Sequence, residues 1–292
     1  MITQDKADKL IQIFVEIDDF CQMINRHLLK ETVKKNLSGS IMTISEIATI
    51  LTFYHLSEYK NFQYYYTSMV ELELREDFPN LVSYKRFLSL IEVAFPYLFS
   101  FRQWQCSQNE YTRRYFIDSK RLPICHNRRI KSNRVFKGLA RRGKSSTGWF
   151  YGFKAHLIVN NLGQIMQFAF TPANIADNNH DILRQISSGV VGRCYGDKGY
   201  VTTILDELWA KGFKLIARLR DNMKNKLCEM QDRYGMAKRG LIESVNDLLM
   251  TMCDLEHSRH RKPINAFTHM TSALVAYAYL DHKPTVKFHV ND

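Results

Sequence analysis

The chain has 292 residues, of which 45% are hydrophobic and 24% are charged, and its formal net charge is +12 at pH 7. This balance fits a globular protein with a sizeable core and excludes collagen-like, fibrous and disordered chains. No run of about 18 or more apolar residues occurs, so we expect no membrane-spanning helix. The first ten residues lack the basic and apolar run of a signal peptide, which predicts a cytoplasmic protein.

The cysteines predict neither a zinc ribbon nor a redox motif. They are widely spaced and form no C-x-x-C pair. We therefore expect reduced, mostly buried thiols. The positions are Cys21, Cys106, Cys125, Cys194, Cys228 and Cys253.

The N-terminal region, residues 1–105, has a helical pattern. Apolar residues from Leu10 to Ile24 recur at helical spacing, and further helices are expected from Ser45, over Tyr64–Val70 and over Tyr84–Ala94. Short helices with aromatic faces are typical of a reader of DNA ends, of a dimerisation module, or of a domain with a packing role alone.

The chain from residue 106 to 292 predicts a second, α/β domain. Strands are expected at 114–123, 150–159, 164–171, 190–196 and 213–219, and helices at 181–187, 201–211, 239–256 and 264–280. The first three strands form an antiparallel meander, and helical crossovers join the other two. This order predicts a ribonuclease H-like fold, a mixed sheet with flanking helices.

The positive charge is concentrated in residues 111–150, which hold 12 basic residues and one acidic residue. Residues 1–110, by contrast, hold 11 basic and 14 acidic residues. A basic block of this length favours a polyanion, most commonly nucleic acid, as the partner, although a solvated basic loop is the alternative. In the acidic N-terminal region, Lys85 and Arg86 are the candidates for DNA contact.

The basic block includes a predicted loop, residues 124–148, inserted between the first two strands. A loop this long in a compact domain is usually functional or disordered. We expect it to supply salt-dependent contacts to DNA phosphates. Its candidate DNA-binding residues are Arg128, Arg129, Lys131, Arg134, Lys137, Arg141, Arg142 and Lys144.

Within this loop, Gly138–Ser145 matches the phosphate-binding pattern G-x-x-x-x-G-K-[ST]. That pattern binds nucleotides when it follows a buried strand and begins a helix. The residues before it are too charged for a central strand, and those after it turn into a strand. We therefore expect no nucleotide cofactor.

Three carboxylates lie in predicted strands and a predicted helix that could bring their side chains together. Asp118 lies inside the first apolar strand, Asp197 ends the fourth, and Glu243 lies in a late helix on the side expected to face the core. Together they predict a hard-oxygen site suited to Mg²⁺ or Mn²⁺, in which two ions can promote phosphodiester displacement. The alternatives are a buried Asp118–Arg pair, a capping role for Asp197 and a surface pair of Glu243 with Arg239.

Other polar residues compete with these carboxylates or accompany them. Asp177 is a rival for the second position, although its place before a helix favours an N-cap. Lys154 and His156 alternate on one face of the second strand, where they point either towards the carboxylates and a phosphate or towards solvent.

At these residues the sequence resembles the bacterial insertion-sequence transposases of the DDE class, whose catalytic domain is ribonuclease H-like. The resemblance covers about residues 112–280. It depends on the motifs IDS (117–119), CHNRRI (125–130), GFKAH (152–156), TPANIAD (171–177), GDKGY (196–200) and KRGLIES (238–244). Related enzymes often carry Tyr three residues before the Arg and Lys seven residues after the Glu, where this chain has Met236 and Met250.

The resemblance implies that Asp118, Asp197 and Glu243 are the catalytic triad. It also implies metal-dependent cleavage of DNA at the inverted repeats of the element and transfer of the 3′-hydroxyl to target DNA by a nucleoid-associated homo-oligomer. Arg239, Lys154 and His156 are then expected to orient DNA phosphates. The alternatives are a nuclease that cuts without joining and a DNA-binding remnant without catalysis.

Overall fold

The structure is a computed structural model of the whole chain. It describes residues 3–27, 42–145, 148–218, 229–256 and 260–288. Leu219, at the end of a predicted strand, and Cys228 lie outside these stretches. Within them, no helix combines the length and the apolar character that crossing a bilayer requires.

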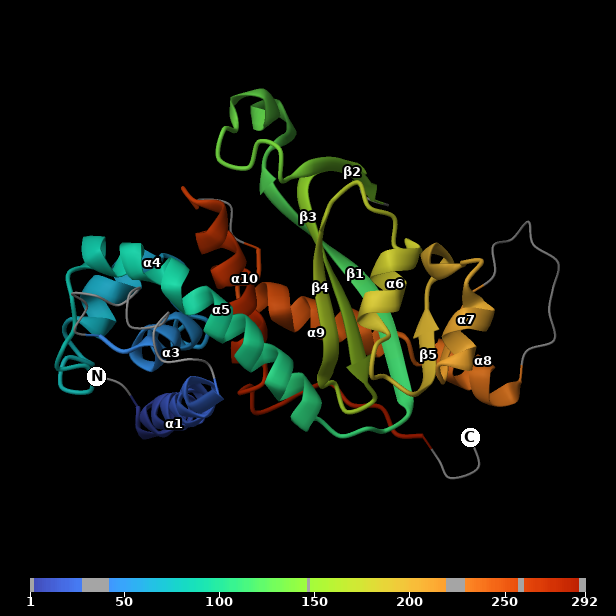
Figure 1. Cartoon of the computed structure of the whole chain (residues 1–292), viewed down its shortest axis with the longest axis horizontal. Coiled ribbons are helices and arrows are strands. Elements are labelled where there is room, and N and C mark those ends of the chain that lie inside the picture. Colours follow the sequence, from blue (N-terminus) through green and yellow to red (C-terminus); the bar gives the residue numbers. More distant parts are fainter. Residues whose placement is uncertain (1–2, 28–41, 146–147, 219–228, 257–259, 289–292) are drawn as a thin grey trace. The chain divides into compact units, whose positions relative to one another are not determined.

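The chain forms two compact units (Figure 1). The helical unit consists of residues 1–105 and 249–280, and the sheet unit of residues 106–248 and 281–292. The division predicted from the sequence also falls at residue 105, but it assigned all of residues 106–292 to one domain. The difference lies in residues 249–280, which return to the helical unit.

The helical unit confirms the helices predicted near the N-terminus. Its elements are α1 (Gln4–His27), α3 (Ile44–Tyr54), α4 (Phe62–Tyr65), the π-helical turn η1 (Tyr66–Val70), α5 (Tyr84–Gln108) and α10 (Pro263–Tyr277). Helix α5 runs well beyond its predicted end at Ala94. Helix α3 begins with a capping box, because the Thr43 side chain accepts from the Glu46 backbone N–H at 3.1 Å and the Glu46 carboxylate accepts from the Thr43 N–H at 2.6 Å.

Apolar burial explains why the late segment joins the helical unit. Val275 and Tyr279 lie in the same hydrophobic core as residues of α1, α3 and α5. The Tyr279 hydroxyl also donates to the Glu16 carboxylate at 2.7 Å. Periodicity identified this helix, but it carries no information about which core the helix enters.

Among its described residues, the sheet unit contains six strands and short helices. Its strands are β1 (Arg114–Cys125), β2 (Arg141–Ser145), β3 (Gly148–Asn160), β4 (Ile165–Pro172), β5 (Gly192–Gly196) and β6 (Phe213–Ala217). Its helices are η2 (Asn127–Ser132), α6 (His180–Ile186), η3 (Lys198–Tyr200), α7 (Leu205–Ala210) and α8 (Met230–Ala237), together with most of α9 (Gly240–Thr251). The predicted strands are confirmed within the described residues, whereas β2 and α8 were not predicted.

The strand order is β2-β3-β1-β5-β6, with β4 also paired to β3. Strand β3 runs antiparallel to β1, β2 and β4, whereas β5 runs parallel to both β1 and β6. An antiparallel meander extended by two parallel strands is the mixed sheet of a ribonuclease H-like fold. The fold class predicted from the order of elements is therefore confirmed.

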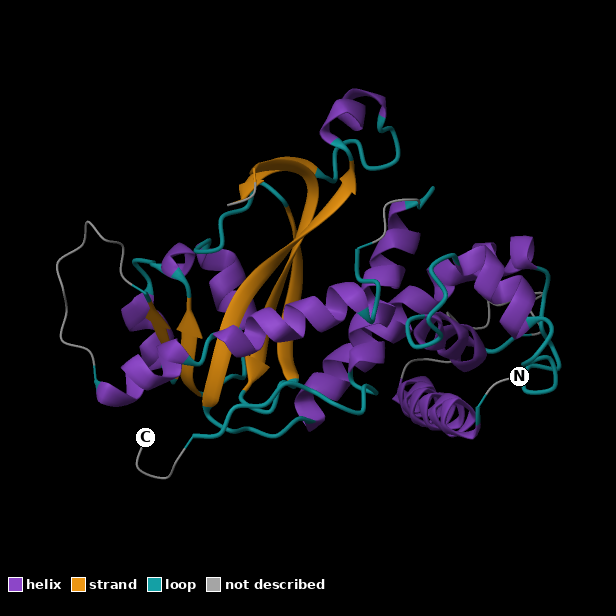
Figure 2. Cartoon of the chain, turned by 180° about the vertical axis from the view of Figure 1, so that it is seen from behind, coloured by secondary structure: helices purple, strands orange, loops and turns teal. Residues whose placement is uncertain are grey.

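Helices cover both faces of this sheet, with α6 on one face and α9 on the other (Figures 1 and 2). Successive residues of β1 point to opposite faces. Ile117 enters the core that contains Leu183 of α6 and Leu208 of α7. Asp118, the next residue, receives a hydrogen bond from Asn246 of α9. The α6 face is therefore largely apolar near β1, and the α9 face carries the first candidate carboxylate.

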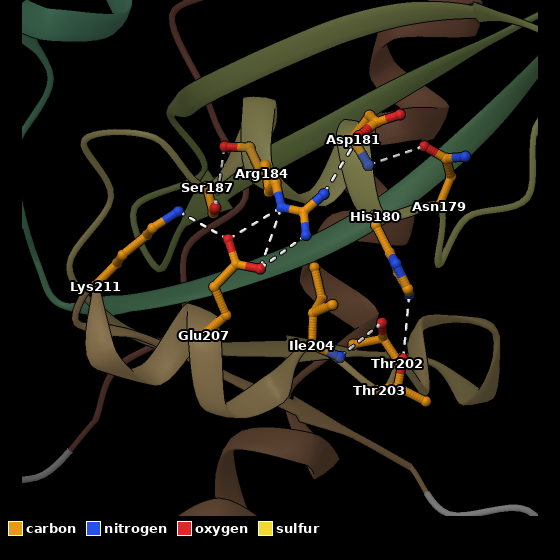
Figure 3. Close-up of polar contacts among 10 residues, drawn as sticks. All are labelled: Asn179, His180, Asp181, Arg184, Ser187, Thr202, Thr203, Ile204, Glu207 and Lys211. Carbon is orange, nitrogen blue, oxygen red and sulfur yellow. Dashed lines mark hydrogen bonds and ion pairs between the residues drawn. The ribbon is translucent and has the colours of Figure 1, made fainter.

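A charged cluster ties α6 to α7 (Figure 3). The Arg184 guanidinium donates to both carboxylate oxygens of Glu207, from Nε to Oε1 at 3.0 Å and from Nη2 to Oε2 at 2.9 Å. Lys211 also donates to Glu207 at 2.9 Å, and Arg184 reaches Asp181 at 3.4 Å. These contacts join the helices that follow the loops carrying Asp177 and Asp197.

Replacing Glu207 by Gln should lower the thermal unfolding temperature at neutral pH. Hydrogen bonds from Arg184 and Lys211 lower the pKa of Glu207 from 4.5 to about 2. Because this folded-state value lies below the unfolded one, the pairing stabilises the fold above about pH 4.5 and is lost as the pH falls through about 2. The difference in unfolding temperature between the native chain and Glu207→Gln should therefore shrink as the pH falls towards 2.

The matched control is Asp206→Asn, an exposed acid on the same helix. It should leave the unfolding temperature nearly unchanged. An equal loss of stability in Asp206→Asn and Glu207→Gln would contradict a specific role for the cluster.

Candidate active site

The pairing of β1 with β5 brings Asp118 and Asp197 together. The parallel register joins Arg114 to Arg193 and Phe116 to Tyr195. Each aspartate comes two residues after this pair, Asp118 within β1 and Asp197 directly after the end of β5. The negative charge of Asp197 acts on the Asp118 carboxyl, so the two side chains lie near each other although 79 positions separate them in the sequence.

Asp118 is half-buried, and the surrounding protein strongly desolvates its carboxyl. Burial raises the pKa of its carboxyl from 3.8 to about 6, and the negative charges of Asp197 and Asp177 contribute to this increase. The backbone N–H of Ser119 and the charge of Arg239 act in the opposite direction. Asn246 donates to Asp118 Oδ2 at 2.9 Å. A buried acid with two acidic neighbours favours the approach of a cation.

Asp197 lies where β5 ends and the 3₁₀ turn η3 begins. Its Oδ1 accepts the backbone N–H of Gly199 at 2.8 Å, so the capping role considered for this residue is present. A Cβ at Gly199 would lie 2.9 Å from Asp197 Oδ1 and 3.6 Å from Asp177 Oδ2. The absence of a side chain at Gly199 thus leaves room between two carboxylates.

Asp177 belongs to the same acidic cluster, and its predicted N-cap role is wrong. The N-cap of α6 is Asn179, whose side chain accepts from two backbone N–H groups. Asp177 Oδ1 instead accepts from Lys154 Nζ at 2.9 Å and from the Ser119 hydroxyl at 2.7 Å. Capping was misassigned by two residues because Asp and Asn are both good N-caps and sequence alone does not choose between them.

Lys154 and His156 both point to the α6 side of the sheet and are buried, so the alternative of a solvated face is wrong for both. Lys154 is held by Asp177 and by the carbonyl oxygen of Ile175 at 3.0 Å. His156 Nε2 lies 2.9 Å from the Thr171 hydroxyl, and burial lowers the pKa of the imidazole from 6.5 to about 4. His156 is therefore neutral at physiological pH.

Glu243 is the least enclosed of the three predicted ligands. Its side chain is 59% exposed and accepts from Arg239 Nη2 at 2.6 Å, which is the surface pair considered for it. The expectation that it faces the core is wrong, because Glu243 is exposed while the buried positions of α9 are Leu241, Ile242, Val245, Asn246 and Leu249. One turn along the same helix, Asn246 contacts Asp118, and the charge of Arg239 also acts on Asp118. Glu243 thus lies at the border of the cluster.

Within the described residues, no group of three or more His, Cys, Asp or Glu side chains is close enough to hold a metal ion. Asp118, Asp197 and Asp177 nevertheless provide the hard oxygen donors that Mg²⁺ and Mn²⁺ prefer. Burial raises the pKa of Asp118, and the charges of Asp197 and Asp177 raise it further although Arg239 acts in the opposite direction. The chemistry of the Asp118 and Asp197 side chains therefore fits a divalent cation, whereas Glu243 is paired with Arg239.

Sequence reasoning missed two side chains of this cluster, Tyr200 and Asn246. Tyr200 is 1% exposed, and its hydroxyl has no hydrogen-bond partner in the described structure. Burial raises its pKa well above 10, and Asp177, Asp118 and Asp197 add to the effect in that order. Tyr200 ends the motif GDKGY and was visible there, whereas Asn246 has no signal beyond lying three residues after Glu243 on a helix.

The basic insertion presents its cations to solvent. The eight candidate DNA-binding residues between Arg128 and Lys144 are all exposed. The segment is anchored by Phe136, which is 2% exposed and packs edge-on against Phe153, and by a 2.7 Å hydrogen bond from the Asn127 amide to the Trp149 carbonyl oxygen. The arrangement provides a basic surface held on β3.

The prediction of one continuous loop over residues 124–148 is wrong for two parts of it. Residues 127–132 form η2, and residues 141–145 form β2, which pairs antiparallel with β3. Residues 146–147 lie outside the described part of the chain. The segment that matches the nucleotide-binding pattern thus ends in an edge strand, and Lys144 does not lie at a helix N-terminus. Lys85 and Arg86, near the start of α5, are exposed as a DNA contact would require.

Comparison with known proteins identifies the sheet unit. A family model described as a transposase DDE domain matches residues 108–263, which is more than half of the chain. The match spans every strand of the sheet and helices α6 to α9. The searches of curated proteins and of solved structures found no match.

Replacing Asp118 by Asn should stabilise the metal-free protein. Because the folded-state pKa of about 6 lies above the unfolded value of 3.8, ionised Asp118 destabilises the fold increasingly as the pH rises between these values. A shift of this size corresponds to at most about 3 kcal/mol. Thermal unfolding in EDTA at pH 7 to 8 should show a higher midpoint for Asp118→Asn, and the gain should vanish below about pH 4.

Asp206→Asn serves again as the control for removal of a negative charge. A lower unfolding midpoint for Asp118→Asn at neutral pH would contradict the electrostatic account of the cluster.

Proposed function

We propose a DNA transposase function on the premise that the chain belongs to the family of transposases with a DDE domain. The protein cleaves DNA at the ends of its own mobile element and joins the freed 3′-hydroxyl to target DNA. The observation that carries this proposal is the parallel pairing of β1, which contains Asp118, with β5, after which Asp197 follows directly, together with the effect of the Asp197 charge on the pKa of Asp118. The family indicates the class of reaction. The two carboxylates provide negative charge that binds the cations needed to neutralise charge on the phosphate during phosphoryl transfer.

In this proposal Asp118, Asp197 and Glu243 hold Mg²⁺ or Mn²⁺, with two ions as the expected number. Bound divalent cations acidify a ligating water or hydroxyl and neutralise charge on the scissile phosphate. The burial of Asp118 supports this role, because a desolvated carboxylate that is crowded by other acids gains most from a cation. The amide of Asn246 fixes the orientation of Asp118 before any ion binds.

The remaining polar residues are assigned positioning roles. Arg239 pairs with Glu243 in the absence of metal, and we propose that it turns to a DNA phosphate when Glu243 becomes a ligand. Lys154 fixes Asp177 beside Gly199, and neutral His156 supports β4 through Thr171. The low pKa of His156 argues against a proton-transfer role for it near neutral pH.

DNA binding is proposed for the basic insertion and, in the helical unit, for Lys85 and Arg86. We infer that the inverted repeats of the element and the target DNA are the two DNA partners, and that the protein acts as a homo-oligomer on them. Residues 124–148 contain exposed basic side chains and no acidic residue, which supports contacts to DNA phosphates that are largely independent of the DNA sequence.

Substitution of the carboxylates tests the catalytic assignment. Asp118→Asn and Asp197→Asn should each reduce Mg²⁺-dependent cleavage of a DNA substrate with the element end by at least about a hundredfold, because each removes a charged ligand. Glu243→Gln should do the same if it closes the site, and Asp206→Asn should retain native cleavage. Unchanged cleavage by Asp118→Asn would contradict the catalytic assignment and favour the alternative of a DNA-binding remnant without catalysis.

The metal itself gives a test that does not depend on activity. Addition of Mg²⁺ to the native protein in thermal unfolding should raise the midpoint, since a ligand that binds only the folded state stabilises it. The increase should be smaller in Asp118→Asn and Asp197→Asn. An equal increase in all three proteins would place the ion elsewhere.

Strand transfer distinguishes a transposase from a nuclease of the same fold. A DNA end that is already cut, incubated with the protein and a circular target, should become covalently joined to the target. Cleavage of uncut ends with no joined product from cut ends would favour the nuclease.

Neutralising Arg128 and Arg129 together should weaken DNA binding and flatten its salt dependence. Each phosphate contact contributes about 0.9 to the slope of log K against log salt, so the slope should fall by up to about two. Equilibrium binding to a duplex at several salt concentrations measures this. The pair Lys85→Ala and Arg86→Ala provides the comparison in the helical unit, and an unaltered slope in the Arg128/Arg129 variant would contradict the role of the insertion.

A further inference from the structure

The helical unit contains a cavity of about 630 Å³ that the catalytic proposal does not use. Its walls come from residues 51–63, 84–91 and 260–272, all within this unit. A cavity of this volume lies within the range of sites for small molecules and is large enough for one nucleotide.

One wall of the cavity is aromatic. Tyr54, Phe62 and Tyr84 line it, and the ring of Phe62 lies 5.2 Å from that of Tyr54 and 6.4 Å from that of Tyr84 between centroids. Aromatic side chains at the border of a cavity bind flat, unsaturated ligands by stacking, and nucleic-acid bases are the commonest such ligands of DNA-binding proteins.

The same cavity carries side-chain amides that suit the edge of a base. The Asn265 Oδ1 atom is enclosed and has no hydrogen-bond partner among the described residues. Enclosed polar atoms are normally paired, so a vacant one on a cavity wall indicates a ligand or water donor. The exposed amide of Gln63 lies on the same lining and offers both a donor and an acceptor.

The charge of the lining is positive. Lys60 and Arg261 belong to it, and no Asp or Glu occurs among the described residues that line the cavity. Lys60 donates to the Thr251 carbonyl oxygen at 3.2 Å, which uses one of its three N–H donors. Residues 1–110, which supply most of the helical unit, carry more acidic than basic residues. The positive charge of the lining is therefore confined to the cavity and is not a property of the whole unit.

Two buried histidines, His55 and His269, belong to the lining of the cavity. His55 Nδ1 donates to the Cys253 carbonyl oxygen at 2.6 Å, and His269 Nε2 donates to the Asp254 carbonyl oxygen at 2.7 Å. Asp254 has a φ of 47°, a conformation unusual for a residue other than glycine. The two histidines thus fix an unusual turn beside the cavity.

We propose that this cavity binds one unpaired nucleotide of the DNA substrate. The base stacks against Phe62 and Tyr84, its edge contacts the amides of Gln63 and Asn265, and its phosphate lies against Lys60 and Arg261. The inference rests on the proposed function for DNA as the substrate, and it assigns the helical unit a role in holding a base that has left the duplex.

The test compares binding of the full-length protein to three DNA duplexes of the same sequence. One is blunt, one carries a short single-stranded 3′ extension, and one carries an extension of equal length without bases. Fluorescence anisotropy should show about tenfold tighter binding for the extension with bases, in line with the stacking of one base, and no comparable gain for the extension without bases.

Arg261→Ala, Gln63→Ala and Asn265→Ala should each remove most of this gain while binding of the blunt duplex persists. Lys262→Ala is the matched control, because this neighbouring exposed lysine pairs with Glu92 and does not line the cavity. It should retain the full gain. Thermal unfolding of each variant shows whether the fold is intact, and Gln63 and Arg261 are exposed enough for substitution to be tolerated.

A second measurement locates the base directly. 5-Iododeoxyuridine in the extension should cross-link on irradiation to Phe62 or Tyr84, as identified by mass spectrometry. Blunt-duplex binding without any gain from the extension, an equal gain from the extension without bases, or cross-links only outside the cavity would overturn this inference alone. Failure to bind any of the three duplexes would overturn the proposed function as well.

Discussion

The parallel pairing of β1 with β5 is the contact on which the candidate active site depends. It brings β1, which contains Asp118, beside β5, after which Asp197 follows directly, although the two aspartates come from distant parts of the chain. The pairing costs free energy, because Asp118 is desolvated and the negative charges around it raise its pKa. Apolar burial on the opposite face of the sheet offsets this free-energy cost, since Ile117, the residue before Asp118, is completely buried there. A site of this kind trades stability for the ability to bind cations.

Helices α6, α7 and α9 hold the acidic residues in place through hydrogen bonds and ion pairs. The contacts of Arg184 and Lys211 with Glu207 join the two helices after the acidic loops, and α9 brings Asn246 to Asp118. Glu243 differs from the aspartates because it is attached to a helix surface and paired with Arg239. Asp118 and Asp197 are therefore held by backbone and side-chain contacts, whereas Glu243 is an exposed side chain on a helix.

The two units divide the chemistry that a DNA-processing protein of this family requires. The sheet unit holds the acidic cluster and the exposed basic insertion, whereas the helical unit encloses a cavity with aromatic, amide and cationic walls. Residues 249–280 complete that cavity after the chain has passed through the sheet unit. The cavity therefore forms only when both segments of the helical unit are folded together.

Local patterns in the sequence determined the alternation of strands and helices, the mixed fold class and the motifs around Asp118 and Asp197, because periodicity and charge are properties of short segments. The same patterns placed Asp177 as a cap, residues 141–145 in a loop and residues 249–280 in the second domain. Tertiary structure alone decided those points, together with the exposure of Glu243 and the positions of Tyr200 and Asn246. Capping, edge pairing and the choice of core depend on neighbours that are remote in sequence, and no single segment carries that information.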